Sequence, residues 1–425
     1  MSNGAKASLM RPVLVLDAET GQALAVVRGL AEKKIPVHIA GKEKYAPALW
    51  SSLPQKRFCY PSPLSAPRGF VKFLSRILAE ENYEAVFPVT DSTVTVLQKF
   101  RSELPRVLWA MAGAESYQKV SDKFFAQELA KKQGVAVPAT FYPPSAGAFR
   151  ALRGRLKFPV VLKPRYSRFY DEREEKIRKG ETRIIFNQTE LEKAFLESRQ
   201  GESFPCIQEW VEGIGFGVEM LIREGEALAV FCHKRIREMD PLGSGSSVCE
   251  SAPIRNDLVQ ASLGMLNACG YEGAAMVEFR IDERTGQSWF VEINGRFWGS
   301  LALPAACGIN FPALYLQMLR GENIPSAARE YPAGVRACSF WREASRLLSA
   351  LKGKPAGWPG PFPTRFQALG DFFESVFKPG QVSFDFQWKD PLPALVANLS
   401  FWLKSFSRLF RRASRKAKEE EFVHA

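Results

Sequence analysis

The chain has 425 residues, 46% of them hydrophobic, which is enough for two to four domains with substantial cores. The formal net charge is +13, but seven lysines and arginines between positions 404 and 418 supply more than half of it, so a general nucleic-acid-binding surface is not indicated. Seven scattered cysteines, three histidines and no apolar run approaching the roughly 20 residues of a membrane span argue against a disulfide framework, a histidine-ligated metal and a spanning helix. We therefore expect a cytoplasmic protein with free thiols.

The first forty residues predict a βαβ unit. A short apolar strand at 13–16 leads into a turn that ends at Gly21, and a helix at 22–34 precedes a second strand at 36–40. Further strands are expected at 83–91 and 106–113, and the domain should end near residue 118. The turn has no GxGxxG fingerprint, which disfavours a nicotinamide-dependent oxidoreductase, the alternative that a βαβ start suggests.

The next segment should place two lysines near buried strands. A helix capped by Ser121, with Phe125 and Leu129 on one face, is predicted to end at Gly134. A strand from Pro159 then delivers Lys163 at its end, where a lysine must find an anion or reach water. Residues 165–180 carry many charges of both signs and are predicted to form a mobile loop.

A strand predicted to begin near residue 227 ends in a basic cluster. The cluster includes His233, Arg235 and Arg237, and a Gly/Ser loop at 243–247 comes next. Basic residues beside a flexible loop suit an anionic, carboxylate-bearing substrate. An exposed basic hairpin without a binding role is the alternative.

Residues 274–300 read as a hairpin that brings carboxylates together. If its turn is centred on Thr285, Glu278 lies opposite Glu292, and both share a face with Asn294. Val277, Phe279, Ile281, Val291 and Ile293 would share the core face. Two carboxylates and an amide on one rigid face repel unless a cation neutralises them, and oxygen ligands of this kind suit Mg²⁺. A merely wet amphipathic hairpin is the alternative.

The character of the chain changes near residue 326. Proline- and aromatic-rich segments predict an extension that spans 326–425. Within it, apolar residues recur at helical spacing over 393–418 with lysines and arginines opposite, which predicts a basic amphipathic helix. Such a helix lies either on an anionic membrane, at its inner face, or on protein.

Taken in order, these features resemble the ATP-grasp superfamily, and within it the stand-alone carboxylate–amine ligases related to carbamoyl-phosphate synthase large subunits. The motifs are an Asp-Lys helix start, a strand with Lys-Pro, a Gln-Glu-aromatic-Val segment and paired carboxylates ending in EINGR. The resemblance covers about residues 11–320. It implies a fold with α/β and α+β parts, in which an ATP-grasp domain at 119–325 follows a doubly wound, Rossmann-like pre-ATP-grasp domain at 1–118. A smaller lid subdomain is expected at 157–212.

The resemblance also implies roles for the nucleotide-binding positions. Lys123 and Lys163 match the two lysines that hold the ATP phosphates in the family. Glu209, Trp210 and Val211 match the hinge that meets the adenine ring.

The metal and phosphoryl positions match in the same way. Glu278, Glu292 and Asn294 correspond to the ligands of Mg²⁺ or Mn²⁺, and Arg296 corresponds to the arginine that, with Lys163, faces the transferred phosphoryl group. Phosphoryl transfer relies mostly on such positioned cations.

Two departures from the family pattern stand out. The phosphate-covering loop lacks its glycines, so Ser167 and Arg168 would have to cover the phosphates. The acidic residue that holds the ribose would fall at Gly215, which leaves Glu212 as the nearest substitute.

The activity implied is ATP-dependent activation of a carboxylate to an acylphosphate, followed by attack of an amine to give an amide. The carboxylate substrate is assigned to Arg235, Arg237, Gly243, Ser246 and Ser247. Partners are then a small carboxylate and a small amine, without nucleic acid; a homodimer and a membrane contact stay open. A non-catalytic ATP-binding or membrane-surface scaffold is the competing hypothesis.

Overall fold

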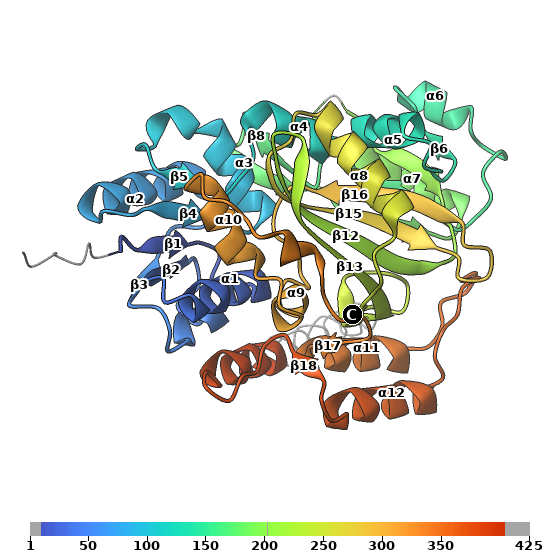
Figure 1. Ribbon diagram of the computed structural model, residues 1–425. Coiled ribbons are helices and arrows are strands. Elements are labelled where there is room, and N and C mark those ends of the chain that lie inside the picture. The colour runs from blue at the N-terminus through green and yellow to red at the C-terminus, as the bar shows by residue number, and fades with distance from the viewer. Residues whose placement is uncertain (1–9, 202, 404–425) are drawn as a thin grey trace, which may run out of the picture.

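The computed structural model describes residues 10–201 and 203–403, which form a mixed α/β structure built on several sheets (Figure 1). The N-terminal sheet is parallel, in the order β3-β2-β1-β4-β5. Its strands are β1 (Val13–Val15), β2 (Val37–Gly41), β3 (Lys56–Cys59), β4 (Ala85–Phe87) and β5 (Leu108–Trp109). Its helices are α1 (Gly21–Glu32), α2 (Pro67–Glu80), α3 (Asp91–Lys99) and α4 (Ala114–Ser121), with short 3-10 turns η1 (Pro47–Trp50) and η2 (Arg101–Glu103). The predicted βαβ start is confirmed, and β1 is fully buried at the centre because all three of its residues are apolar.

A second, smaller sheet is antiparallel, in the order β10-β7-β11-β6. It consists of β6 (Thr140–Phe141), β7 (Val160–Lys163), β10 (Arg183–Ile185) and β11 (Cys206–Glu209), with α6 (Ala146–Arg150) and α7 (Gln188–Glu197). Phe149 and Phe195 stack at 4.1 Å between their ring centroids and pack with Leu162 and Ile207 into a core of its own. The sheet therefore begins with β6, before the lid boundary expected at residue 157.

The predicted loop at 165–180 is instead a hairpin of β8 (Arg168–Asp171) and β9 (Lys176–Lys179). It packs on the N-terminal part of the chain, where Tyr170 meets Phe100 edge-on at 5.6 Å. Ile177 is buried, and its N–H donates to the carbonyl of Leu64 at 2.9 Å. The prediction was wrong because these two apolar residues, scattered among charges, gain a partner surface only from a distant part of the chain.

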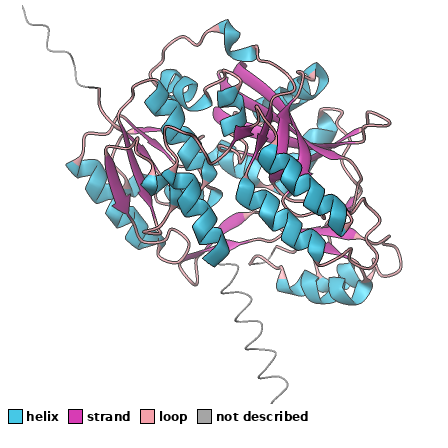
Figure 2. Cartoon of the chain, turned by 90° about the horizontal axis from the view of Figure 1, so that it is seen from below, coloured by secondary structure: helices cyan, strands magenta, loops and turns pink. Residues whose placement is uncertain are grey.

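The largest sheet has the order β16-β15-β12-β13-β14-β17-β18. Its strands are β12 (Ile214–Arg223), β13 (Glu226–Glu238), β14 (Ser246–Ser251), β15 (Gly273–Ile281), β16 (Ser288–Asn294), β17 (Arg336–Cys338) and β18 (Val382–Ser383). Helices α5 (Lys123–Lys132), α8 (Asn256–Ala268), α9 (Ala302–Ala306) and α10 (Phe311–Leu319) accompany it. Figure 2 shows this sheet and the N-terminal sheet as separate groups of strands with helices around them.

The N-cap of helix α5 lies one residue later than predicted. Asp122, not Ser121, caps it by accepting from the N–H groups of Phe124 and Phe125, because Ser121 is the last residue of α4. Phe125 is exposed rather than on the buried face with Leu129. Gly134 follows the helix at a φ of +74°, as its predicted role as the stop requires.

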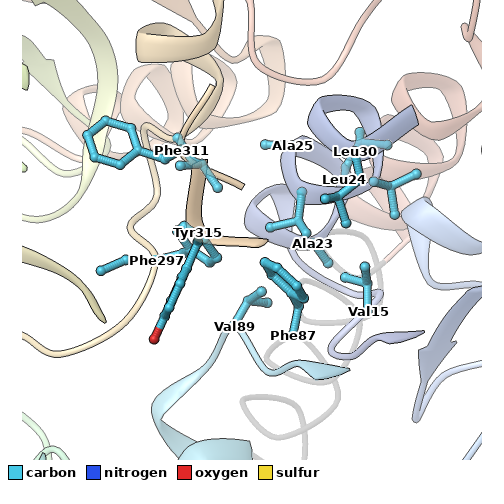
Figure 3. Close-up of a cluster of buried hydrophobic side chains, with 14 of the residues drawn as sticks. Val15, Ala23, Leu24, Ala25, Leu30, Phe87, Val89, Phe297, Phe311 and Tyr315 are labelled. Carbon is cyan, nitrogen blue, oxygen red and sulfur yellow. The ribbon is translucent and has the colours of Figure 1, made fainter. Parts of the chain in front are cut away.

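The N-terminal sheet and the largest sheet share one hydrophobic core. Figure 3 shows Phe297, Phe311 and Tyr315 on one side of this core and residues of β1, α1 and β4 on the other. Phe87 lies 6.2 Å from Phe297 and 6.1 Å from Tyr315 between ring centroids. These two parts of the molecule are therefore packed as a unit.

The extension after residue 326 folds back onto the body. It comprises η3 (Ser326–Arg329), β17, α11 (Phe340–Leu351), α12 (Arg365–Phe377), β18 and a helical stretch at 392–403. The buried Asp390 carboxylate ties it to the N-terminal part by accepting from Arg28, Ser51 and Ser52. Of the basic helix predicted at 393–418, residues beyond 403 lie outside the described part of the chain. No helix within the described ranges is long and apolar enough to cross a membrane.

Candidate functional site

A cavity of about 650 Å³ lies between the four-stranded and the seven-stranded sheets. Lys163 of β7 and Glu209 of β11 line it from the smaller sheet, and Glu278 of β15 and Glu292 of β16 line it from the larger one. Helix α11 adds Trp341 and Arg342. Three separate parts of the chain therefore contribute walls to one cavity.

The predicted carboxylate pair is in register. Glu278 pairs directly with Glu292 across β15 and β16, and the amide nitrogen of Asn294 lies 3.1 Å from Oε1 of Glu278 and 3.4 Å from Oε1 of Glu292. A bulge follows, because Phe279 pairs with Phe290 and leaves Val291 as the extra residue. Val291 consequently lines the cavity rather than the core, which corrects the strict alternation predicted for this strand.

Cations surround these carboxylates. The ammonium group of Lys123 forms an ion pair with Glu292, and the guanidinium of Arg235 lies 2.6 Å from Glu278. Burial alone would raise the pKa of Glu292, but the charge of Lys123 and its hydrogen bond, with help from Lys163, lower that pKa to about 2. Burial by itself would lower the pKa of Lys123, but the charge and the hydrogen bond of Glu292 raise that pKa above its ordinary value. The carboxylate is thus held fully ionised.

Arg296 is held beside the same cluster by Asp91 and Asn294, and it also donates to the carbonyl of Phe297 at 2.8 Å. Its guanidinium lies 2.8 Å from the carboxylate of Asp91 in α3 and donates to the Asn294 side-chain oxygen at 2.9 Å. Burial opposes its charge, but Asp91 raises the pKa of Arg296 above its ordinary value. The N-terminal part of the chain therefore positions a residue of the site.

Lys163 has no counter-ion among the described residues. It is 7% exposed at the end of β7, and no carboxylate of the described residues lies within 4 Å of its ammonium group. Burial, and then the nearby charge of Lys123, lowers the pKa of Lys163. A buried lysine without a partner and facing a cavity is suited to an anion that enters from solution.

The segment at 209–212 lies at the rim of the cavity. Glu209, Trp210 and Val211 line it, whereas Glu212 lines a neighbouring cavity of about 280 Å³ together with Trp210. The Trp210 ring packs edge-on against Trp358 of the extension at 5.0 Å.

Several predicted residues do not line the main cavity. Arg168 donates to the hydroxyl of Ser92 at 2.9 Å and to the carbonyl of Ser167, so both residues sit against the N-terminal part of the chain. Arg237 turns to the extension, where it lies 3.2 Å from Glu343. Ser247 is fully buried.

The predicted substrate positions that do line the cavity are Arg235, Gly243 and Ser246. Arg235 donates to the carbonyl of Ser244 at 2.9 Å and contacts Glu278 and Glu238, so carboxylates already neutralise it.

The polar residues that line the cavity include three that the sequence analysis did not name as site residues. His233 lines it from β13, Arg342 from α11 and Gln22 from the start of α1. His233 had a sequence signal, as a member of the basic cluster. Arg342 and Gln22 had none, since only the folding-back of the extension and of the N-terminal part brings them here.

The donor set could hold a divalent cation. The described residues contain no cluster of three or more His, Cys, Asp or Glu side chains suited to a metal, and the candidate set is two carboxylates with one amide. The Asn294 amide nitrogen faces both carboxylates and its oxygen accepts from Arg296, so the amide would have to give up the Arg296 contact to offer its oxygen to a cation between the carboxylates. Oxygen ligands of this kind fit Mg²⁺ or Mn²⁺.

Comparisons with known proteins agree with this geometry. The sequence model of the family described as "ATP-grasp in the biosynthetic pathway with Ter operon" matches residues 206–339. No curated protein matches the chain.

Solved structures share its fold at low sequence identity. Biotin carboxylase from Campylobacter jejuni, in a complex with β,γ-ATP, has a TM-score of 0.58 at 18% identity, over 77% of this chain and 74% of that one. The biotin carboxylase domain of 2-oxoglutarate carboxylase from Hydrogenobacter thermophilus, with MgADP, ADP and bicarbonate, has a TM-score of 0.59 at 15% identity, over 76% and 73%. The L-amino acid ligase from Bacillus licheniformis has a TM-score of 0.54 at 16% identity, over 73% and 74%. The chain therefore shares its fold with these structures over about three quarters of its length, and its residues 206–339 match a family of ATP-grasp domains.

Proposed function

We propose that the protein is an ATP-dependent ligase that activates a carboxylate as an acylphosphate and joins it to an amine, with release of ADP and phosphate. One observation carries this proposal: the unpaired Lys163 and the ion-paired Arg296 line one cavity with the carboxylates of Glu278 and Glu292, and Lys123, which does not line it, is ion-paired to Glu292. A structural role needs no such concentration of buried charge. The similar proteins include an amino acid ligase and biotin carboxylases crystallised with adenine nucleotides.

We place the nucleotide between the two sheets. The adenine would lie at Glu209, Trp210 and Val211, and the phosphates would extend to Lys163, which supplies the missing anion partner for that lysine. Lys123 would join the phosphates once its carboxylate partner turns to a metal ion. Glu212, in the neighbouring cavity, is the residue proposed for the ribose.

Ser167 and Arg168 would reach the phosphates only if the β8–β9 hairpin moved away from Ser92. We therefore assign phosphate binding to the lysines first. The hairpin remains a candidate cover.

Glu278, Glu292 and Asn294 are the residues proposed to hold Mg²⁺ or Mn²⁺. Such an ion, when bound, neutralises phosphate oxygens and draws charge from the transferred group. Arg296 would face that group, where its guanidinium stabilises the charge that develops on the phosphoryl oxygens. Arg235, Gly243 and Ser246 would approach the carboxylate substrate.

The reaction would proceed in two steps. An oxygen of the substrate carboxylate attacks the γ-phosphorus, and the bond from that phosphorus to ADP breaks. The amine nitrogen then attacks the acyl carbon, the bond from that carbon to the phosphate oxygen breaks, and the nitrogen loses a proton. Lys163 and Arg296 would contribute by holding the substrate carboxylate and the γ-phosphoryl group in line.

The test is ADP release with Mg²⁺·ATP and pairs drawn from the twenty proteinogenic amino acids. We expect turnover with at least one pair, and a loss of orders of magnitude in Glu292→Gln. Glu226→Gln, which removes an exposed carboxylate at the start of the same sheet's β13, is the matched control. Undiminished turnover in Glu292→Gln would refute the assignment, and nucleotide binding without turnover by any pair would favour the scaffold hypothesis.

A membrane contact is a second proposal, favoured by the surface of the extension. Three helical segments each expose apolar residues at helical spacing, and aromatic contacts connect them: Phe340 of α11 lies 5.5 Å from Phe372 of α12, and Trp341 lies 6.3 Å from Phe401. The exposed set comprises Phe340, Leu348, Leu351, Phe366, Leu369, Phe373, Phe377, Leu392, Leu395, Leu399, Trp402 and Leu403.

Charge favours an anionic lipid surface as the occupant. Among the described residues from 340 onward, the exposed charged side chains are five basic ones and a single acidic one, Glu374. The basic set is Lys352, Lys354, Arg365, Lys378 and Lys389. Apolar residues framed by cations suit the interface of an anionic bilayer.

Co-sedimentation with phosphatidylcholine vesicles, with and without phosphatidylserine, tests this contact. We expect binding that requires phosphatidylserine and is lost in Phe366→Glu/Phe377→Glu. Tyr45→Glu/Leu196→Glu, which adds the same charge at exposed apolar residues elsewhere, should bind as before. No binding by the unchanged protein, or a concentration-dependent dimer that the first variant abolishes, would overturn the membrane proposal.

A further inference from the structure

The cavity continues along the large sheet beyond the two carboxylates. Glu292, Glu278, Gly217 and His233 are successive direct partners across β16, β15, β12 and β13. Directly paired residues point to the same face of a sheet, so the imidazole faces the same side as the carboxylates. It lies two strand spacings, or about 10 Å, from Glu278.

A glycine makes room for this imidazole. A Cβ built on Gly217 would lie 2.5 Å from Cε1 of His233, closer than any real contact allows. The missing side chain of Gly217 therefore leaves space in this row beside Glu278, and the imidazole of His233 fills that space.

A buried carboxylate fixes the orientation of the imidazole. Nδ1 of His233 lies 2.5 Å from Oε1 of Glu219, and the side chains of both residues are at most 3% exposed. Burial raises the pKa of Glu219 above its ordinary value, and the charge and hydrogen bond of His233 offset only part of that rise. With Glu219 ionised, Nδ1 carries the proton and donates, which leaves Nε2 as an acceptor.

Nε2 has no hydrogen-bond partner among the described residues, and His233 lines the cavity. A histidine with one nitrogen fixed by a carboxylate and the other free at a cavity is arranged as a general base.

Arg342 adds an anion-binding group to the same cavity. One guanidinium nitrogen donates to the carbonyl of Ser246 at 2.9 Å, and the guanidinium packs by the rings of Trp341 and Phe384 at 5.2 and 5.5 Å. No carboxylate of the described residues lies within ion-pair distance of its guanidinium. The nearby Asp385 carboxylate accepts a hydrogen bond from Ser339 instead. Burial lowers the pKa of Arg342.

Gly299 lies against this guanidinium. A Cβ there would come 3.6 Å from its nearest nitrogen, an ordinary van der Waals contact, and Gly299 and Arg342 both line the cavity. The remaining N–H groups of Arg342 are thus free to bind an anion.

We propose that this end of the cavity is the subsite for the amine substrate, that the amine is an amino acid whose carboxylate binds Arg342, and that His233 removes the amine proton. This inference rests on the proposed ligase function. The carboxylate at Arg342 is not the one that is phosphorylated, because that one must reach Arg296 and the metal ligands.

The amine nitrogen forms a bond to the acyl carbon, and the carbon–oxygen bond to phosphate breaks. The electron pair of that bond leaves with the phosphate. The proton released by the nitrogen moves to Nε2 of His233, and Glu219 stabilises the imidazolium that forms.

Binding can be tested before any substrate is known. The full chain is loaded with the non-hydrolysable nucleotide AMP-PNP and Mg²⁺, and its thermal midpoint is measured with each of the twenty amino acids and with the corresponding amino acid amides. We expect at least one amino acid, but not its amide, to stabilise the loaded protein. In Arg342→Gln the affinity for that amino acid should fall on the order of 30-fold or more, with partial retention in Arg342→Lys. Arg173→Gln, which removes an exposed arginine of the β8–β9 turn, is the matched control.

Two results would overturn the subsite. In the first, no amino acid stabilises the loaded protein more than its amide does. In the second, the Arg342→Gln protein still distinguishes the amino acid from its amide. A protein that AMP-PNP and Mg²⁺ fail to stabilise would instead refute the proposed ligase, and this subsite with it. The two failures are therefore distinguishable.

The base is tested by changing the nucleophile. Hydroxylamine is unprotonated at neutral pH and needs no base, so it should sustain ADP release in His233→Asn at close to the unchanged protein's rate, whereas the amino acid reaction falls by about 100-fold or more. Equal losses with both nucleophiles would mean that His233 has only a structural role. An undiminished amino acid reaction would also refute the proposal.

Discussion

Replacement of Glu292 by glutamine should reveal how much free energy the charge cluster stores. A pKa lowered from the ordinary 4.5 to about 2 corresponds to about 3 kcal/mol of stability at neutral pH. The Glu292 side chain is 29% exposed toward the cavity, so solvent screens part of this, and we expect Glu292→Gln to lower the free energy of unfolding by about 2 kcal/mol. Because folding lowers this pKa, the contribution is present above pH 4.5 and is lost as the pH falls toward 2.

The assay is urea unfolding of the nucleotide-free protein at pH 7, in a double-mutant cycle with Lys123→Met. We expect a coupling energy of about 2 kcal/mol between the two positions. The difference between Glu292→Gln and the unchanged protein should narrow as the pH is lowered below 4.5. A coupling energy below about 0.5 kcal/mol, the range of exposed ion pairs, would refute the reasoning. Glu226→Gln again serves as the control.

Three further perturbations follow from the geometry. Lys163→Ala should weaken ATP binding at least about tenfold in isothermal titration calorimetry, because a phosphate would lose its charged donor; affinity equal to that of the unchanged protein would contradict this. Asp390→Asn should lower the free energy of unfolding by about 3 kcal/mol in urea titrations, because Arg28 would stay buried without its counter-ion, and a loss under 1 kcal/mol would refute that role. Gly217→Ala should displace the His233 imidazole and slow turnover with the amino acid but not with hydroxylamine. If the variant turned over both nucleophiles at the rates of the unchanged protein, the ring would be undisturbed.

The sequence was most informative where contacts are local. The pairing of Glu278 with Glu292 follows from strand alternation and a short turn, and the structure confirms it. The bulge at Val291 did not follow, because one extra residue in a strand leaves no compositional mark.

Contacts between distant segments could not be read from the chain. The β8–β9 hairpin acquires its apolar partner from Phe100, some seventy residues earlier. Arg342 reaches the cavity only because β17 and β18 add the extension to the edge of the large sheet. The Glu219–His233 pair lies on adjacent strands, yet its meaning depends on Gly217, whose missing side chain is informative only once the register is known.

The shared core of Figure 3 determines which parts of this molecule can shift when a nucleotide enters. Aromatic side chains of α10 and of the segment after β16 pack against Phe87 of β4, so we expect the N-terminal sheet and the largest sheet to move together. The small sheet carries a separate hydrophobic centre around Phe149 and Phe195. Any clamping over the phosphates is therefore expected as a swing of that small sheet, with Lys163 carried along at the tip of its strand.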